Sequence, residues 1–333
     1  MTSHIVEIDE QLKPETQLYR TLDFYGAASI VKERQLMFTR ADNFDDRNEG
    51  VDRLLGQLET RSLNGMGWND LESARLHHER FKRSHYISCW TTRRESVAMW
   101  SLYSPDHCSV RVETTVADLA ATLTQLAEKY SVTRVSSEKL NQLVTVATHA
   151  RMQKVLYRPL VTLSDRIQRR VRAYRKIKAQ QKPRETLAEI FSAANLRYFQ
   201  REEKRRIFLQ RSPFLFKDES FQHEEEVRLV VKIGETVWTK ELQEEQTCFS
   251  PGHEYFDAAK MSLTFWGEVR STPLPSREYA SCGNLVKSVA IDPRCPPHKA
   301  KFMRQWFLEN GIPVAESTCF GYLPSRFEEF PES

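Results

Sequence analysis

Residues 221–231 read Phe-Gln-His-Glu-Glu-Glu-Val-Arg-Leu-Val-Val, three carboxylates followed at once by a β-branched, apolar run. A run of this kind is typical of a buried strand. Because side chains alternate along a strand, Glu224 and Glu226 are predicted on one face and Glu225 on the other. Two acids beside an apolar core repel each other and are partly desolvated, which perturbs their pKa values and suits charge-stabilising catalysis. Ordinary surface glutamates on a solvated edge strand are the alternative, and the pattern alone leaves both open.

The length and composition limit the classes of protein to which the chain can belong. The chain has 333 residues, 40% hydrophobic and 28% charged, with a formal net charge of +4, which is an ordinary globular balance. This length allows a single domain over residues 1–333 with room for an insertion. No apolar run reaches the roughly 20 residues that cross a bilayer, and the polar N-terminus lacks a secretory signal pattern. The six cysteines are scattered without CxxC pairs, which favours free thiols over disulfides or structural zinc. We therefore expect a cytoplasmic protein without membrane contact and without a metal site.

Short apolar segments separated by turn residues predict an alternation of strands and helices along the rest of the chain. Strands are expected at 18–20, 36–39, 85–92, 109–113 and 285–291, and helices at 23–34, 95–103, 115–130 and 299–310. In the strand at 85–92, Tyr86, Ser88 and Trp90 share one face. No Gly-rich phosphate loop follows a strand, which argues against a doubly wound parallel sheet.

A basic segment interrupts this alternation. Residues 165–184 are dense in Lys and Arg, and an apolar stripe at Val171, Tyr174 and Ile177 keeps helical spacing through them. We expect residues 115–210 to be a helical, basic insertion with one strongly positive face. Such a face attracts anions, and nucleic acid is the partner that this charge suggests. A solvated basic helix packed on the core is the alternative.

Several segments share their order and spacing with a known family. They are Leu18-Tyr19-Arg20, the loop at 38–50, Ile87-Ser88-Cys89-Trp90, the helix around Met99, Trp100 and Tyr103, Glu224-x-Glu226-x-Arg228, and the block at 286–307. On these residues the chain resembles a bacterial domain-of-unknown-function family, number 2971. The chain departs from the family in the acidic loop and at Cys108-Ser109, where a glycine is usual.

The same segments resemble ADP-ribosyltransferases of the Arg-Ser-Glu type. Those enzymes carry an Arg on the first strand, a Ser on a middle strand and a Glu-x-Glu on a later strand. The resemblance implies an α+β fold in which two packed, mainly antiparallel sheets surround a cleft, with the helical insertion on one side. It also implies NAD as the substrate and ADP-ribose transfer to a macromolecular acceptor, which the basic segment suggests is nucleic acid. A toxin or antiphage effector is the setting that such an enzyme suggests, with an antitoxin or regulatory protein as a further partner.

The resemblance also implies catalytic roles. Cleavage of the bond between nicotinamide and ribose passes through an oxocarbenium-like state. Glu226 is expected to stabilise that state while it binds a ribose hydroxyl, a kind of interaction worth a few kcal/mol. Ser88 is expected to orient Glu226, and Glu224 to orient or deprotonate the acceptor.

Four further residues are expected to bind NAD. Arg20 would hold the phosphates with its planar guanidinium, and the neighbouring Tyr19 is assigned to the same site. Tyr86 or Trp90 would stack on the nicotinamide ring.

Two other functions stay open at this point. A metal-dependent nuclease would gather oxygen ligands for Mg²⁺ and hold its substrate on the basic helix. Its candidate ligands are Asp42, Asp45, Asp46, Glu49, Glu224 and Glu226. A non-catalytic nucleotide or nucleic-acid binding module is the second alternative.

Overall fold

The structure of the chain is a computed structural model. It describes residues 6–46, 48–51, 53–54, 78–79, 81–129, 143–165, 168–169, 172, 214–237 and 275–321, with the backbone alone for 143–149 and 234–237.

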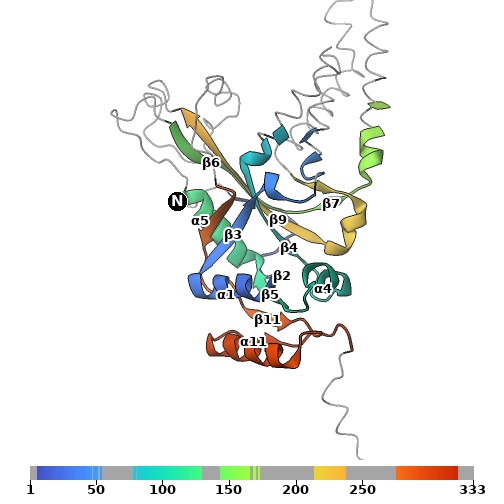
Figure 1. Cartoon of the computed structure of the whole chain (residues 1–333). Coiled ribbons are helices and arrows are strands. Elements are labelled where there is room, and N and C mark those ends of the chain that lie inside the picture. The colour runs from blue at the N-terminus through green and yellow to red at the C-terminus, as the bar shows by residue number, and fades with distance from the viewer. Residues whose placement is uncertain are drawn as a thin grey trace, which may run out of the picture.

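One large mixed sheet dominates the described residues (Figure 1). Its strands are β1 (Val6–Ile8), β2 (Gln17–Asp23), β3 (Gln35–Arg40), β4 (His85–Thr91), β5 (Ser109–Thr115), β6 (Leu143–Lys154), β9 (Glu226–Val237), β10 (Arg277–Ser281), β11 (Ser288–Ile291) and β12 (Val314–Ala315). The main path runs β1-β6-β9-β4-β2-β5-β11-β12, and β3 joins β4 to β10. The pairs β1–β6 and β11–β12 are parallel, while the other pairs are antiparallel. A separate two-stranded sheet pairs β7 (Leu156–Tyr157) with β8 (Phe216–Lys217).

The predicted α+β class is confirmed, but the predicted pair of packed sheets differs from this arrangement. The reason lies in β4, which has hydrogen-bonding groups on two edges. One edge pairs with β9 along its whole length. The other edge pairs with β3 at Tyr86 and Ile87, and with β2 only at Thr91. Because β4 joins both groups of strands, the described strands of the two predicted sheets form one branched sheet.

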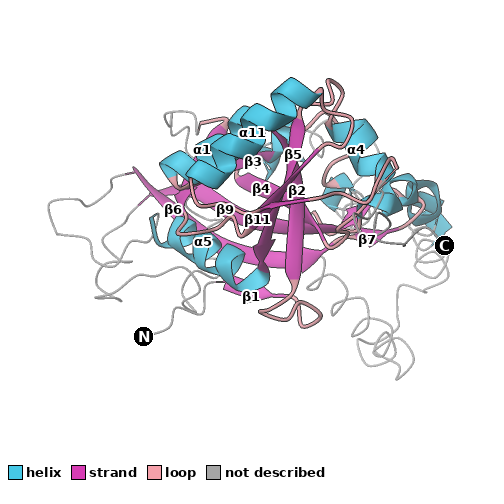
Figure 2. Ribbon diagram, turned by 90° about the horizontal axis from the view of Figure 1, so that it is seen from below, coloured by secondary structure: helices cyan, strands magenta, loops and turns pink. Residues whose placement is uncertain are grey.

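Helices cover the sheet. They are α1 (Phe24–Glu33), α4 (Val97–Tyr103), α5 (Val116–Lys129) and α11 (Pro297–Glu309), with 3-10 turns η1 (Ala41–Asn43) and η4 (Glu219–Glu224). Asp23 caps α1 by accepting a hydrogen bond from the Gly26 amide. Phe24 joins α1 to α11, since its ring lies 5.5 Å from Trp306 and 5.8 Å from Phe307. Figure 2 shows these two helices side by side on the sheet.

The apolar run of β9 is buried on both faces. Val227, Leu229 and Val231 enter the main core, which α5 closes with Leu119 and Leu123. The other face carries a smaller second core of Ala41, Ile87, Phe214 and Val230, with Phe81 packed against it. Burial of both faces explains why the run is apolar without alternation.

The segment at 115–210 differs from the predicted helical insertion in its first part. Residues 143–154 form β6, which pairs with β9 inside the main sheet, and α5 packs on the same sheet. The insertion therefore does not begin at 115. Most of the basic residues between 166 and 210 lie outside the described residues.

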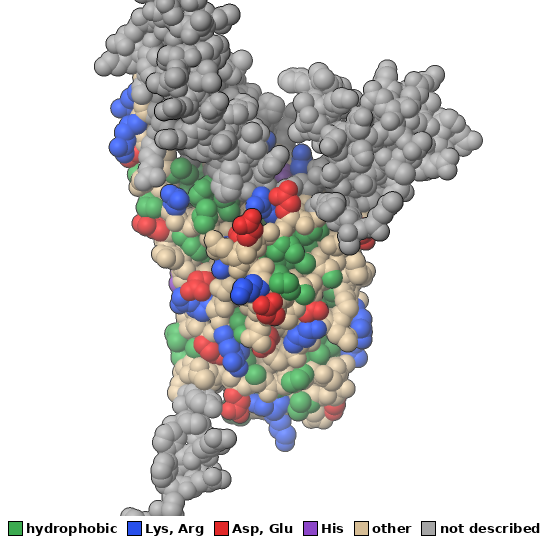
Figure 3. All heavy atoms as spheres, turned by 180° about the vertical axis from the view of Figure 1, so that it is seen from behind, with side chains coloured by type: hydrophobic (Ala, Val, Ile, Leu, Met, Phe, Trp, Pro, Cys, Tyr) green, Lys and Arg blue, Asp and Glu red, His purple; other side chains and the backbone are tan. Residues whose placement is uncertain are grey.

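The surface of the described part is mixed in charge. Lys and Arg side chains are interspersed with Asp and Glu on the face seen in Figure 3. Within the described part, none of the helices has the length and apolar character needed to cross a bilayer.

Candidate functional site

The three consecutive glutamates lie at a turn. Glu224 ends the 3-10 turn η4, and Glu226 begins β9. Between them Glu225 has a left-handed backbone, with φ 43°. The prediction placed Glu224 and Glu226 on one face of a single strand, whereas they belong to different elements. They still point to the same place, because Lys217 contacts both. Glu225 instead pairs with Arg93 at the surface.

Lys217 links the two buried acids. Its Nζ lies 2.6 Å from Glu224 Oε2 and 3.3 Å from Glu226 Oε2. The two carboxylates are 4% and 5% exposed. Lys217 is in the short strand β8, and its ammonium also lies 4.3 Å from the centre of the Phe221 ring. The positive charge of Lys217 thus offsets the repulsion between the two acids that the sequence suggested.

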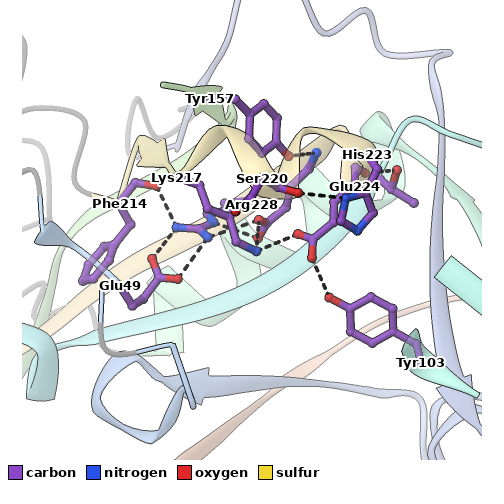
Figure 4. Close-up of polar contacts among 11 residues, drawn as sticks. Glu49, Tyr103, Tyr157, Phe214, Lys217, Ser220, His223, Glu224 and Arg228 are labelled. Carbon is purple, nitrogen blue, oxygen red and sulfur yellow. Dashed lines mark hydrogen bonds and ion pairs between the residues drawn. The ribbon is translucent and has the colours of Figure 1, made fainter. Parts of the chain in front are cut away.

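Arg228 holds the other side of Glu226. It donates from Nε to Glu226 Oε1 at 2.7 Å and from Nη2 to Glu226 Oε2 at 3.1 Å. It also pairs with Glu49, with 3.0 Å between Nη2 and Oε2, and donates to the Phe214 carbonyl oxygen at 3.0 Å. We call Glu49, Lys217, Glu224, Glu226 and Arg228 the carboxylate network (Figure 4). It sets three carboxylates against two cations.

Electrostatics keep Glu226 ionised. Burial alone raises the pKa of this carboxyl, but the charge and hydrogen bonds of Arg228 and the charge of Lys217 outweigh it and bring the pKa to about 2. For Glu49 the effect of burial is larger than the effect of the ion pair with Arg228, so the pKa of this carboxyl is raised. Burial lowers the pKa of Lys217, but the neighbouring Glu226 and Glu224 raise it above its ordinary value.

Two tyrosines complete the site. Tyr103, from α4, donates its hydroxyl to Glu224 Oε1 at 2.9 Å, and 44% of the residue is exposed. Tyr157, from β7, accepts the backbone amide of Glu226 at 2.7 Å. Burial raises the pKa of both hydroxyls, so they act as neutral hydrogen-bonding groups. Tyr103 therefore connects the buried network to the surface.

Arg20 and Ser88 are brought together as a pair. Arg20 Nη1 donates to Ser88 Oγ at 2.9 Å, across the two strands β2 and β4. Ser88 also accepts from Trp90 Nε1 at 3.2 Å. The resemblance implied that Ser88 orients Glu226, but the two side chains do not hydrogen-bond to each other. Side chains alternate along β4, so Ser88 points to the opposite face of the sheet from Cys89. The next residue, Cys89, is close enough to Glu226 for each of the two groups to shift the pKa of the other.

Cys89 is the link between the pair and the network. Arg20 lies close enough for its pKa to respond to Cys89 and Tyr103, although burial is the larger effect and lowers that pKa. Burial and the charge of Glu226 raise the pKa of the Cys89 thiol well above its ordinary value, so it is a neutral donor. Arg20 and Glu226 are both close enough to Cys89 for electrostatic coupling, while Ser88 contacts Arg20 and has no direct bond to Glu226.

The aromatic residues assigned to NAD are core residues. Tyr86 is 0% exposed and donates its hydroxyl to the Pro275 carbonyl oxygen. Trp90 is 2% exposed. Tyr19 is buried below Arg111, whose guanidinium lies 5.3 Å from the ring centre. None of the three rings presents an exposed face on which a nicotinamide could stack.

Five of the six acids proposed as Mg²⁺ ligands, all except the exposed Asp45, have hydrogen-bond or ion-pair partners among the described residues. Asp42 pairs with Arg40, and Asp46 accepts the amide of Asn48. Glu49 belongs to the carboxylate network. Among the described residues, no three His, Cys, Asp or Glu side chains are grouped so that they could hold a metal ion.

Several site residues were missed by reasoning from sequence. Tyr157 and Lys217 come from the short strands β7 and β8, which precede and follow the basic segment in the sequence, and nothing in their local sequence marks them. Glu49 and Tyr103 lie in segments that carry the family resemblance, and Glu49 was also named as a possible Mg²⁺ ligand, but neither was predicted to contact Glu224 or Arg228. Arg228 was detectable from the alternation, because it follows Glu226 on the same face of β9.

Comparison with known proteins supports the first resemblance. A family model described as "Protein of unknown function (DUF2971)" matches residues 99–229, from α4 into β9. No curated protein matches the chain. No solved structure matches it either. The likeness to ADP-ribosyltransferases therefore rests on the residue pattern alone.

Proposed function

We propose that the chain is a mono-ADP-ribosyltransferase that cleaves NAD and passes ADP-ribose to a macromolecular acceptor. One observation carries the proposal. The strands β9, β4 and β2 are adjacent in the sheet, Arg20 of β2 hydrogen-bonds to Ser88 of β4, and the next residue, Cys89, is close enough to Glu226 of β9 for each to shift the other's pKa. An Arg, a Ser and a Glu on three adjacent strands support the proposal, because the resemblance implies these residue types on successive strands of the sheet. Nucleic acid as the acceptor rests on the basic segment of the sequence.

The reaction breaks the bond between the nicotinamide nitrogen and the ribose carbon, and the electron pair leaves with nicotinamide. Positive charge then grows on the ribose ring. Glu226 is ionised over the whole physiological range, and an ionised carboxylate beside the ring would stabilise that charge. Fixed charges of this kind contribute about 3 kcal/mol, or roughly two to three orders of magnitude in rate.

Glu224 has the capacity to receive a substrate donor. Its oxygens accept one hydrogen bond each, from Tyr103 and Lys217, and a carboxylate can accept about four. Glu226 uses more of its capacity, because it accepts two hydrogen bonds from Arg228 and one from Lys217. We therefore assign Glu224 to the acceptor nucleophile or to a ribose hydroxyl, next to the exposed Tyr103.

Arg20 has donors left for phosphate. A guanidinium carries five N–H groups, and the contact with Ser88 uses one of them. Planar guanidinium groups bind phosphate oxygens in pairs. Arg20 is therefore the residue that we assign to the diphosphate of NAD.

The test is label transfer from NAD. Purified protein is incubated with NAD labelled in the adenylate part, together with DNA, RNA and protein, and the fraction that carries label is identified. Glu226→Gln should lose at least about a hundredfold in rate. Glu225→Gln is the matched control, because it makes the same change one residue away at an exposed position. Equal transfer by the two variants and the wild type would refute the proposal.

A circular-dichroism spectrum separates loss of chemistry from loss of fold. Glu226 is buried against Arg228, so Glu226→Gln is assayed only at a temperature where its spectrum matches that of the wild type. Glu224→Gln provides a second variant at the same site, with the same expected loss of transfer.

A non-catalytic binding module is the second candidate. The observation that favours it is the saturation of the network, in which Glu226 and Arg228 bind each other and their neighbours. This alternative predicts no release of nicotinamide by the wild type with any acceptor. A nuclease is disfavoured, because Lys217 and Arg228 already neutralise the acids that would bind the metal.

A further inference from the structure

Two cysteines meet where β5 begins and where the turn before α11 ends. The strands β5 and β11 are antiparallel partners. At the end of their ladder the Asp292 amide donates to the Ser109 carbonyl oxygen at 3.0 Å. The Cys295 amide then donates to the Asp292 carbonyl oxygen at 2.8 Å, which closes a turn. This turn keeps Cys295 near the end of the ladder, where Cys108 precedes Ser109.

Lys299, in the first turn of α11, contacts this pair of thiols. Its Nζ donates to Cys108 Sγ at 3.4 Å. Burial raises the pKa of the Cys295 thiol to about 11, and Cys108 adds to the rise, whereas the charge of Lys299 opposes it. The two thiols are therefore close enough to affect each other, and one ammonium group acts on both.

The other described cysteines lack such a partner thiol. Burial raises the pKa of Cys89, Cys282 and Cys319, and no second cysteine is among the groups that shift it further. Within the described part of the chain, the pairing of two thiols is thus a property of Cys108 and Cys295.

The surroundings of the pair suit oxidation by a small molecule. The thiolate is the form of cysteine that reacts with oxidants, and a neighbouring cation favours that form. The Lys299 ammonium lies where it would balance the negative charge of a Cys108 thiolate. Cys108 is 9% exposed and Cys295 is 8% exposed, so a small oxidant reaches them more readily than a bulky thiol reagent does.

We propose that Cys108 and Cys295 are a redox pair that forms a disulfide in response to hydrogen peroxide. The Cys108 thiolate attacks one peroxide oxygen, the O–O bond breaks, and hydroxide leaves as Cys108 becomes a sulfenic acid. The Cys295 sulfur then attacks the Cys108 sulfur. The S–S bond forms, the S–O bond breaks, and the hydroxyl group leaves as water with the proton of Cys295. Two thiols thus lose two electrons, and one peroxide is reduced to two waters.

Residues beside the two cysteines hold the end of α4. Ser109 Oγ donates to the Tyr103 carbonyl oxygen at 3.0 Å. Arg294 Nη2 donates to the Trp100 carbonyl oxygen at 2.9 Å. Ser109 follows one cysteine in the sequence and Arg294 precedes the other. The disulfide would therefore tie two supports of α4 together and make the end of this helix more rigid.

The test of the pair is disulfide mapping. The reduced, folded wild type is treated with hydrogen peroxide, the remaining thiols are alkylated, and the digest is analysed by mass spectrometry. We expect a disulfide between Cys108 and Cys295 that dithiothreitol reverses. A folded wild type that forms no such disulfide, or that links either cysteine to a different one, overturns the proposal.

Single substitutions separate the two steps. Cys295→Ser should stop at the Cys108 sulfenic acid, which dimedone traps, whereas Cys108→Ser should give no oxidised product at Cys295. Cys282→Ser is the matched control, because it removes another buried thiol and should leave the disulfide unchanged. Circular-dichroism spectra that match the wild type show that each variant is folded. Trapping at Cys295 in Cys108→Ser, with none at Cys108 in Cys295→Ser, would contradict the proposed order.

The role of Lys299 is tested by the rate of dimedone trapping in the Cys295→Ser background. Lys299→Met should slow the trapping about two- to fivefold, as expected for the loss of an exposed charged contact. Lys299→Arg keeps the charge and should react at the unsubstituted rate. Lys301→Met, at an exposed position of the same helix, is the control. Equal rates for Lys299→Met and Lys301→Met would refute the assignment of Lys299.

Hydrogen exchange tests the effect on α4. The Ser104 amide donates to the Trp100 carbonyl oxygen at the end of this helix. Its exchange should be about tenfold slower, or more, in the oxidised wild type than in the reduced protein. Cys295→Ser should show no slowing after peroxide treatment, and an unchanged rate in the oxidised wild type would refute the link to α4. None of these measurements needs NAD, so failure of the transferase proposal leaves their outcome unaffected.

Discussion

Replacing Glu226 by glutamine tests the electrostatics of the carboxylate network through protein stability. The pKa of Glu226 falls from its ordinary value of 4.5 to about 2 in the folded protein. At about 1.4 kcal/mol for each pKa unit, the ionised carboxylate contributes about 3 kcal/mol to the free energy of unfolding at neutral pH. Glutamine has nearly the same shape but lacks the charge, so it loses this contribution.

The contribution of Glu226 to the free energy of unfolding is expected to decrease as the pH falls. A depressed folded-state pKa stabilises the protein above the unfolded value and loses that effect as pH falls through the folded value. For Glu226 the window runs from about pH 4.5 down to about pH 2. At pH 3.5, one unit below the unfolded value, about 1.4 kcal/mol of the contribution is already lost.

Urea unfolding at pH 7 and at pH 3.5, at one ionic strength, measures both quantities. The wild type should exceed Glu226→Gln by about 3 kcal/mol at pH 7, and the gap should narrow by about 1.4 kcal/mol at pH 3.5. Glu225→Gln serves as the control. Its exposed pair with Arg93 contributes at most about 1 kcal/mol. A gap that stays constant between the two pH values, or that is absent at pH 7, would refute the reasoning.

Two other substitutions test single features of the structure. Lys217→Met should lower the free energy of unfolding by about 3 kcal/mol at pH 7, because it removes a positive charge that neutralises the buried Glu224 and Glu226. Urea unfolding measures this difference. An unchanged urea midpoint would mean that Arg228 alone balances the charge of the acids. Arg34→Gly should raise the free energy of unfolding by about 1 kcal/mol, because Arg34 ends α1 in a left-handed conformation, with φ 53°, that glycine adopts without strain. A lower melting temperature for Arg34→Gly would instead show that the hydrogen bond from Arg34 to Asn284 outweighs that strain.

Local patterns predicted most of the individual elements. The strand β9, the alternation of β4 and the apolar stripe of α5 were all readable, because each depends on the spacing of apolar residues along a short stretch. The strand β6 was missed and assigned to an insertion. Its strand character comes from pairing with β9 and β1, which lie far away in the sequence. Contacts of this kind override weak local preferences.

In the site, too, some features followed from local sequence and others depended on contacts between distant segments. Glu224 and Glu226 were identified as neighbours, but the alternation rule gave the wrong reason, because the left-handed backbone of Glu225 joins two different elements. The pairing of Arg20 with Ser88 is consistent with the resemblance. Lys217 had no signal in its own stretch of sequence, since only the meeting of β8 with the end of η4 gives it a role.

The sequence by itself determined most of the strands and helices outside residues 143–157, and that the start of β9 carries acids. These properties depend on nearest neighbours along the chain. Only the tertiary structure decided which charges meet. It brings Glu49 to Arg228 across 179 positions of sequence. The energy of a charge inside a protein depends on what surrounds it in space, and distance along the chain does not record that.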